Sequence, residues 1–212
     1  MPPLPPIDFS ALFRDPRMFD SKDTFRAAGF TVRKTSAHNI MVGRHPAAPD
    51  HLFKKYSRDV PLDKQLANYQ SRKRGAKKLR QFIAEHQLRH MIVPQKWIYD
   101  LPDSFSRHGE RSHLLVVERM KLLDTKDNER RYRDIDKDVL KELCVVLHAF
   151  RGLDSAIHNV RFTQSGQITF IDTENWERSQ RNFFHYIRRE LSERSRQRAD
   201  RMFRKLSRGE KL

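Results

Sequence analysis

The sequence contains very little cysteine and no long apolar run. Cys144 is the only cysteine among 212 residues, so the chain can form neither an internal disulfide nor a multi-cysteine metal site. A single thiol within an apolar run fits a reducing compartment and indicates a small core residue rather than a nucleophile. No apolar run approaches the ~20 residues that a membrane-spanning helix needs, and the N-terminus lacks the basic-then-apolar pattern of a signal peptide.

Acidic residues are also scarce relative to basic ones. The chain has 43 Lys and Arg against 27 Asp and Glu, which gives a formal net charge of +16. This charge predicts an anionic partner: a nucleotide, a nucleic acid, a phospholipid or an acidic protein. With 33% charged and 37% hydrophobic residues the chain is globular but polar, and its length suits one domain or two small lobes.

Periodicity and turn residues divide the chain into an N-terminal segment, a strand-rich half and a helix-rich half. The proline-rich segment 1–20 also contains apolar residues, which favours a packing arm or a linker. Alternation predicts strands, and helical spacing predicts helices. The predicted elements are strands at 29–34, 40–44, 51–56, 91–102 and 113–120, helices at 62–89 and 135–151, a charged loop at 124–133, and a helical tract from Trp176 with a basic stretch at 194–212.

Three polar side chains surround a predicted hairpin. Asp154 is followed by Asn159, then by the turn 163–166, an apolar run at 168–171, and Asp172. The two ends of a hairpin are neighbours, so Asn159 and Asp172 should lie close together. A carboxamide and a carboxylate oxygen suit Mg²⁺, and Asp154 beside them can orient a hydroxyl. The alternative is an ordinary surface hairpin with Asp and Asn as turn formers.

This pattern resembles the catalytic and metal-binding loops of the protein-kinase-like superfamily. The resemblance implies that Asp154 is the catalytic aspartate and that Asn159 and Asp172 hold Mg²⁺ on ATP. Gly152-Leu153 replaces the usual His-Arg, and Thr173-Glu174 replaces the usual Phe-Gly. The resulting Asp-x-Glu is more similar to the small-molecule kinases of the superfamily, such as the aminoglycoside and choline types.

The same resemblance assigns residues upstream of the hairpin. Lys54 would contact the ATP phosphates from its strand as a catalytic and nucleotide-binding residue, although alternation leaves Lys55 as the other candidate. Ser36 would lie in the turn over the phosphates, and Glu118 and Met120 would bracket the hinge that binds adenine. Each assignment has an alternative. Lys54 and Lys55 are solvated lysines of an edge strand, the turn with Ser36 belongs to a plain antiparallel meander, and the strand near Glu118 and Met120 is a plain core strand.

One expected partner is missing from the helical pattern at 62–89. A kinase helix would supply a glutamate here to hold the strand lysine. Between Asp63 and Glu85 the sequence has basic residues and no acid. Gln65 or Gln70 would replace the glutamate, or Glu85 would supply it late in the helix.

We therefore expect an α+β chain with a protein-kinase-like two-lobe fold, made of a small antiparallel-sheet N-lobe and a truncated helical C-lobe. The predicted ranges are an N-terminal arm at 1–24, the N-lobe at 25–120, and the C-lobe with its basic C-terminal helix at 121–212. The predicted function is ATP- and Mg²⁺-dependent phosphate transfer to a hydroxyl of a protein or a small molecule.

Two other functions stay open from the sequence. The first is a catalytically inactive pseudokinase scaffold, which the missing glutamate and the glycine-poor turn favour. The second is a basic nucleic-acid-binding protein, although no recognised motif is present and aromatic residues are not interleaved with the basic runs.

Location and partners follow from size and charge. The compact size and divergent motifs resemble kinase-like effectors that bacteria inject into host cells, so we expect a cytoplasmic protein or one secreted into a host. The basic C-terminal helix would dock on an acidic protein or a membrane surface, or it is a solvated helix.

Overall fold

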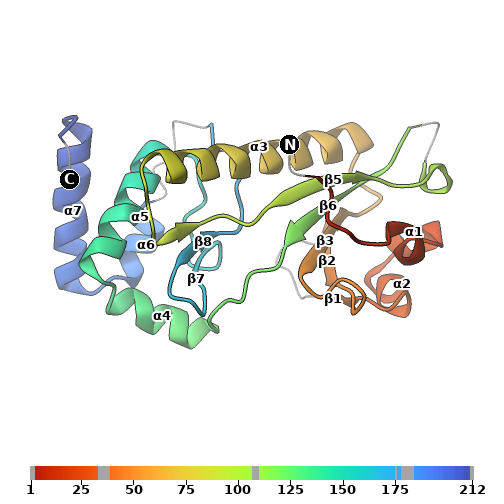
Figure 1. The fold of residues 1–212 in the computed structure, drawn as a ribbon, viewed down its shortest axis with the longest axis horizontal. Helices are drawn as coiled ribbons and strands as arrows, with labels where there is room; N and C mark the ends of the chain where they lie inside the picture. The colour runs from red at the N-terminus through yellow and green to blue at the C-terminus, as the bar shows by residue number, and fades with distance from the viewer. Residues whose placement is uncertain (1–2, 33–38, 107–109, 175, 178–183, 211–212) are drawn as a thin grey trace. The chain divides into compact units, whose positions relative to one another are not determined.

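A computed structural model describes residues 3–32, 39–106, 110–174, 176–177 and 184–210. The fold is α+β, with a five-stranded antiparallel sheet in the order β1-β2-β3-β6-β5 and a three-stranded sheet in the order β4-β8-β7 (Figure 1). The chain forms two compact units, the first comprising Met1–Lys73 and Gln95–Arg119, the second Arg74–Pro94 and Met120–Leu212.

The first unit contains the larger sheet. Its strands are β1 (Thr31–Val32), β2 (Ile40–Arg44), β3 (His51–Tyr56), β5 (Lys96–Asp100) and β6 (His113–Glu118). The predicted strands at 40–44 and 51–56 are confirmed at both ends, and both bury residues on both faces of the sheet. β3 lies between β2 and β6, so it is an interior strand.

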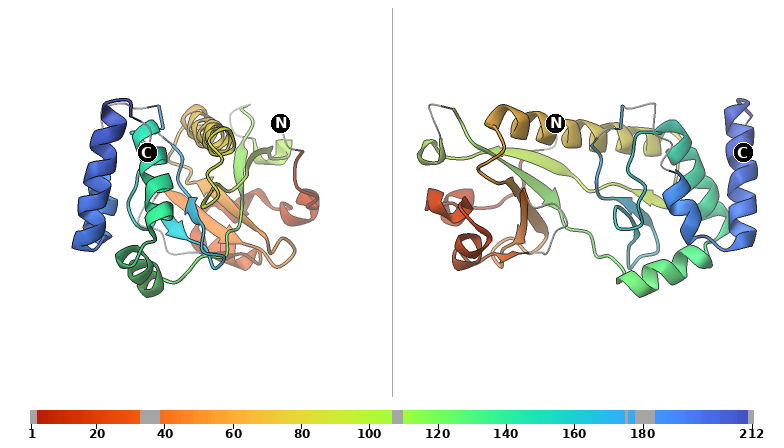
Figure 2. Two further views of the ribbon diagram at one scale, coloured as in Figure 1. Left: turned by 60° about the vertical axis from the view of Figure 1, so that its left-hand side comes forward. Right: turned by 180° about the vertical axis from the view of Figure 1, so that it is seen from behind.

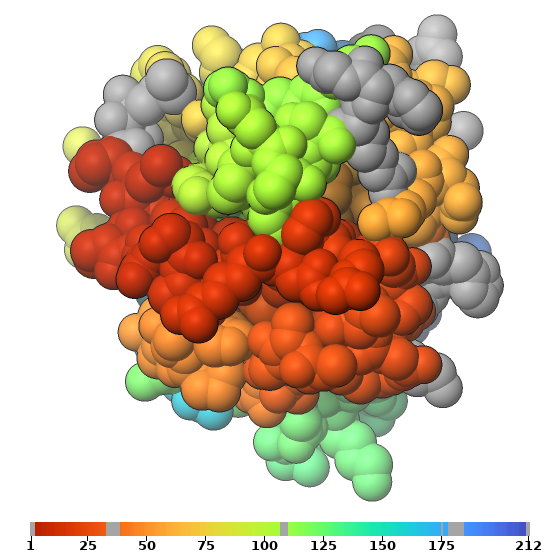
Figure 3. Space-filling model, turned by 90° about the vertical axis from the view of Figure 1, so that its right-hand side faces the viewer, coloured from red at the N-terminus to blue at the C-terminus, as the bar shows by residue number. Residues whose placement is uncertain are grey.

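The N-terminal segment packs on one face of this sheet. It folds as α1 (Phe9–Leu12), the 3₁₀ helix η1 (Pro16–Phe19) and α2 (Lys22–Ala27), each begun by a side-chain cap from Asp8, Asp15 or Ser21. Figure 3 shows this segment as a continuous outer layer on its side of the unit. The cluster that the segment forms with this face of the sheet is rich in aromatic rings and includes Phe9, Phe13, Phe19, Phe25, Phe30, Phe53, Trp97 and Phe105.

Helix α3 (Leu62–Glu85) packs on the opposite face of the same sheet through Tyr69. Tyr69 is fully buried against Tyr56, and its hydroxyl accepts a hydrogen bond from the Tyr56 N–H at 3.0 Å. Burial raises the pKa of the Tyr69 phenol. The helix predicted at 62–89 ends at Glu85 instead, and the following turn places Gln87 at φ 53°.

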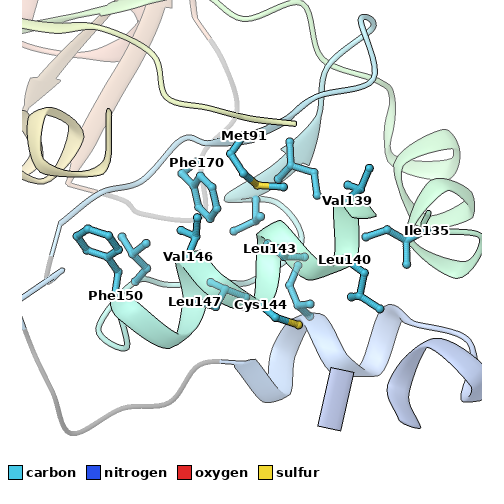
Figure 4. Packing of buried hydrophobic residues seen from close by; sticks show 14 of the residues in the cluster. Met91, Ile135, Val139, Leu140, Leu143, Cys144, Val146, Leu147, Phe150 and Phe170 are labelled. Carbon is cyan, nitrogen blue, oxygen red and sulfur yellow. The ribbon is translucent and has the colours of Figure 1, made fainter. Parts of the chain in front are cut away.

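The second unit is built around α5 (Lys137–Ala149). Figure 4 shows α5 side chains meeting Met91 and Phe170 on one side, with Cys144 pointing toward the C-terminal helices on the other. Those helices are α6 (Phe184–Glu190) and α7 (Glu193–Ser207), and α7 lies alongside α5 (Figure 2). β4 (Met91–Ile92) pairs in parallel with β8 (Ile168–Phe170), which pairs antiparallel with β7 (Val160–Phe162).

The charged segment predicted as a loop at 124–133 is a helix, α4 (Thr125–Arg133), so that prediction is wrong. Asp124 caps it by accepting a hydrogen bond from the Asp127 N–H at 2.9 Å. Its buried side is only Asn128 and Tyr132, spaced i and i+4. The apolar stripe is too narrow to be recognised within so many charges.

The two units divide the chain differently from the predicted ranges. Within 1–24, the residues that the structure describes form part of the core of the first unit, and residues 74–94, predicted in the N-lobe, group with the second unit. The division between Arg119 and Met120 lies beside the predicted boundary at 120/121. Within the described ranges, no helix combines the length and apolar character needed to cross a membrane.

Replacing Phe13 by alanine should test whether the N-terminal segment belongs to this core. Phe13 is 3% exposed and its ring contacts those of Phe19, Phe30 and Phe53. We expect Phe13→Ala to lower the free energy of unfolding by about 3–5 kcal/mol, measured by urea denaturation. Leu4→Ala, at a residue 48% exposed, should change it by less than about 0.5 kcal/mol. Equal stabilities for the two variants would contradict the assignment.

Candidate functional site

The hairpin predicted between Asn159 and Asp172 is present. Val160 pairs with Phe170 and Phe162 with Ile168, and one further ladder bond runs from the Ile171 N–H to the Asn159 carbonyl at 2.8 Å. Because Asp172 directly follows Ile171, its backbone lies within roughly 8 Å of that of Asn159. The open end of the hairpin therefore brings together two polar residues that are distant in the sequence.

Asp154 is held at this open end by two hydrogen bonds. Its Oδ1 accepts from the Ala156 N–H at 3.0 Å, and its Oδ2 accepts from Asn159 Nδ2 at 2.9 Å. The second bond orients the Asn159 carboxamide, because Nδ2 faces Asp154 and Oδ1 must face away from it. Asp154 and Asn159 thus form one fixed pair of side chains, with the carboxamide oxygen directed elsewhere.

Asp172 lies two residues after the end of β8. Its Oδ1 accepts a hydrogen bond from the Glu174 N–H at 3.3 Å, and Thr173 between them is fully buried. In a regular ladder, Asn159 and Asp172 would point to opposite faces. Both residues lie outside the strands, Asn159 in the turn before β7 and Asp172 in the turn after β8, so the strand alternation does not determine their side-chain directions.

A carboxamide oxygen and a carboxylate at this spot suit Mg²⁺, which takes one or two protein oxygens and leaves its other positions to phosphates and water. Among the residues that the structure describes, no cluster of three or more His, Cys, Asp or Glu side chains could hold a metal by itself. One carboxamide oxygen and one carboxylate are too few ligands to hold a metal alone, so an ion at this spot would need further ligands such as phosphate or water.

Gly75 of α3 lets the segment after Asp172 approach the helix. A Cβ at this position would overlap the carbonyl oxygen of Thr173 and would lie 2.6 Å from Cδ1 of Trp176. Glycine within a helix costs about 1 kcal/mol relative to alanine, so the close approach explains its presence. The sequence pattern showed a glycine in the helix but not the segment that contacts it.

Helix α4 supports the other strand of the hairpin. Asn128 is 2% exposed, and its Oδ1 accepts from the Phe162 N–H at 2.9 Å. The buried Tyr132 donates its hydroxyl to the Val160 carbonyl at 2.9 Å and packs edge-on against Phe162. Burial raises the pKa of Tyr132 well above its usual range. These two residues position β7. Their role was not predicted, because the charged pattern at 124–133 indicated a loop.

The two lysines of β3 are buried on opposite faces of the sheet. Lys54 is 9% exposed and shares a face with Leu52, Tyr56 and the Tyr69 ring of α3. Lys55 is 5% exposed, and its Nζ donates to Oε1 of Gln65 at 2.6 Å. The sequence predicts Gln65 as a possible partner of the strand lysine. Gln65 does bond a lysine of β3, but this lysine is Lys55 and not the preferred candidate Lys54. The alternative of two solvated edge-strand lysines is wrong, because β3 is an interior strand.

The Lys54 face of the sheet also carries other buried cations. Strand register places Lys54 opposite Leu115 and Lys96 opposite Val117, so both lysines lie on one face. Arg72 of α3 is buried as well. The first unit thus concentrates positive charge on the face that Tyr69 packs against.

The hinge candidates lie where the chain passes from one unit to the other. The Glu118 carboxylate accepts from the Gln95 N–H at 2.9 Å, and the Glu118 N–H donates to the Gln95 carbonyl at 2.9 Å. Glu118 therefore binds the residue before β5 through both its side chain and its backbone. The backbone N–H of Glu118 is already hydrogen-bonded to the Gln95 carbonyl. Met120 begins the second segment of the second unit. Ser36 lies outside the described residues.

A scan of protein-family models finds none that matches this chain, and a search of curated proteins finds no significant match.

Gly75→Ala should destabilise the protein although alanine is the better helix former. The new Cβ must displace the Thr173 backbone, and overpacking of this kind costs about 1–3 kcal/mol. The measurement is urea unfolding followed by circular dichroism. Lys78→Ala, at an exposed position of the same helix, is the control and should change stability by less than about 0.5 kcal/mol. A Gly75→Ala protein as stable as the parent would show that the contact is not close.

Asn128→Ala should weaken the hairpin by leaving the Phe162 N–H without its acceptor. A buried unsatisfied donor costs about 1–3 kcal/mol, which we expect as a loss in the free energy of unfolding. Amide hydrogen exchange should also quicken at β7. Lys126→Ala, exposed on the same helix, should leave exchange at β7 unchanged. Unaltered exchange in the Asn128 variant would contradict the supporting role of α4.

Proposed function

We propose that this protein is an ATP- and Mg²⁺-dependent phosphotransferase of the protein-kinase-like superfamily. The observation that carries the proposal is the open end of the β7–β8 hairpin, where Asp154 and Asn159 are hydrogen-bonded and the ladder runs on to the residue before Asp172. An aspartate, an asparagine and a second aspartate gathered in this order suit phosphate transfer.

The order of elements supports the same proposal. Strands β2 and β3, the latter with two buried lysines, are followed by α3, then by β5 and β6, then by α5, which leads into the Asp154 loop. We infer that the first unit corresponds to an N-lobe and the second to a reduced helical C-lobe. Under this proposal ATP binds with its phosphates near Lys54, and Glu118 and Met120 flank the adenine.

Each side chain then has a defined task. The Asp154 carboxylate, fixed by Ala156 and Asn159, orients the acceptor hydroxyl and receives its proton as the new O–P bond forms and the bond between the β- and γ-phosphates breaks. Asn159 Oδ1 and the Asp172 carboxylate would hold Mg²⁺, which supplies neutralisation of phosphate charge when bound. Lys54 steadies the phosphates. Catalysis comes mainly from positioning and from charge neutralisation.

The acceptor is a hydroxyl of a small molecule or of a protein. The Asp-x-Glu formed by Asp172 and Glu174 is similar to that of the small-molecule kinases, which favours a small-molecule acceptor. The turn itself is stabilised by the Glu174 N–H on Asp172.

A pseudokinase scaffold is the second candidate, and one observation favours it. Between Asp63 and Glu85 helix α3 has no acidic residue, where a kinase would use a glutamate, and its neutral Gln65 bonds Lys55. Under this reading the same fold binds a nucleotide or a partner without turnover.

Asp172→Ala should lower Mg²⁺-dependent phosphate transfer from labelled ATP by roughly 100-fold or more, because the phosphate charge loses its fixed counter-ion site. Autophosphorylation and transfer into a cell lysate are the readouts. Asp134→Ala, an exposed acid at the end of α4, is the matched control and should keep full activity.

Phosphate transfer, a thermal-shift assay with ATP and a nucleic-acid binding titration together separate the three candidates. Unchanged transfer in the Asp172 variant would remove that residue from the site. A thermal shift with ATP and no transfer by the parent protein would favour the scaffold. Absence of both, together with RNA or DNA binding that weakens steeply with salt, would favour a nucleic-acid-binding protein.

A further inference from the structure

A pocket of about 480 Å³ lies in the first unit, where the end of β3 meets the start of α3. Its other walls come from η1 and from the segment around the 3₁₀ helix η2 (Asp103–Phe105). All its lining residues belong to the first unit, whereas Asp154, Asn159 and Asp172 belong to the second. The pocket is therefore built without the three residues of the proposed catalytic site.

The polar lining of the pocket is cationic and rich in hydroxyl groups. Lys55 and Arg58 supply positive charge, and Ser104, Ser106 and Ser112 supply hydroxyls. None of the described residues that line the pocket is acidic, although Asp20 outside the lining forms an ion pair with Arg58. Cations together with hydroxyl donors form the surroundings that a phosphate group requires.

The Lys55 ammonium is fixed in its place at the wall. The Gln65 amide donates from Nε2 to the Val60 carbonyl at 2.7 Å and to the Ser57 carbonyl at 3.3 Å, which determines which way the amide faces. Its Oε1 therefore faces Lys55 and accepts the bond at 2.6 Å. Lys55 is also only 5% exposed, so the charge is preorganised rather than carried on a mobile side chain.

The rest of the lining is apolar and partly aromatic. The rings of Phe19 and Phe105 lie 5.7 Å apart, and Pro16 and Leu62 complete this side. An inorganic ion alone would leave this surface in contact with water. A ligand that combines one phosphate group with a small apolar or aromatic part would cover both sides of the pocket.

We propose that this pocket binds a small molecule that carries a phosphate monoester on an apolar or aromatic group. The phosphate oxygens accept from Lys55 Nζ and from the Ser112 hydroxyl, and the organic part lies against Phe19 and Phe105. The site goes beyond the proposed phosphotransferase activity and uses the face of β3 opposite Lys54.

Binding of phenyl phosphate to the full chain, without ATP or Mg²⁺, tests this site by isothermal titration calorimetry. Saturable binding is expected for phenyl phosphate, weaker binding for inorganic phosphate, and none for phenol. Lys55→Met should weaken the affinity by roughly tenfold or more, as expected for loss of a hydrogen bond to a charged group, and Ser112→Ala by a smaller factor. Far-UV circular dichroism confirms that each variant is folded.

Two controls keep the result specific. Lys54→Met, on the other face of the same strand, and Lys64→Met, exposed on α3, should both bind phenyl phosphate like the parent. If Lys55→Met does not fold, Ser112→Ala alone decides, because removing one hydroxyl preserves the backbone. Absence of saturable binding, or equal losses in the Lys54 and Lys55 variants, would overturn the proposal.

The same titration separates this site from the proposed catalytic one. Asp172→Ala should bind phenyl phosphate with unchanged affinity even where it has lost phosphate transfer. A loss of phenyl phosphate binding in that variant would overturn the proposed pocket while leaving the phosphotransferase proposal standing. Retained binding in a parent protein that transfers no phosphate would support the pocket and count against the enzyme.

Discussion

The hydrogen bond from the Ile171 N–H to the Asn159 carbonyl is the constraint on which the candidate site depends. It extends the β7–β8 ladder by one residue beyond the strands and so brings the approach to β7 beside the exit from β8. Asp154 joins this point through the Asn159 amide. Support comes from both sides, since α4 holds β7 through Asn128 and Tyr132, and α3 receives the segment after β8 at Gly75.

Elements with strong patterns could be predicted from the sequence, and those with weak patterns could not. β2 and β3 are short strands that contain apolar runs and are bounded by turn residues, and α5 repeats apolar residues at helical spacing. α4 buries only an asparagine and a tyrosine, and one side-chain cap from Asp124 rather than an apolar stripe marks its start. The N-terminal segment has its apolar residues in short runs, so its contribution to a core depends on a sheet formed much later in the chain.

The residues of the site divide in the same way. The hairpin between Asn159 and Asp172 could be predicted, because turn residues and spacing are local properties, whereas the roles of Asp154, Asn159 and Asp172 remain predictions. The role of each β3 lysine could not be predicted, since alternation places Lys54 and Lys55 on different faces without indicating what covers each face. Tyr69 packs on the Lys54 face and Gln65 bonds Lys55, and both contacts involve α3. Gly75 likewise acts through Thr173, which is far from it in sequence.

The absence of a Cβ at Gly75 also limits how this part of α3 can be placed against the Thr173 carbonyl. Its neighbours Arg74 and Ala76 both carry a Cβ, and each residue advances a helix by about 1.5 Å and turns it by roughly 100°. Any screw-like displacement of the helix along its axis would present a side chain to the Thr173 carbonyl in place of the gap. The contact with Thr173 therefore fits only the present position of Gly75 relative to the segment after Asp172.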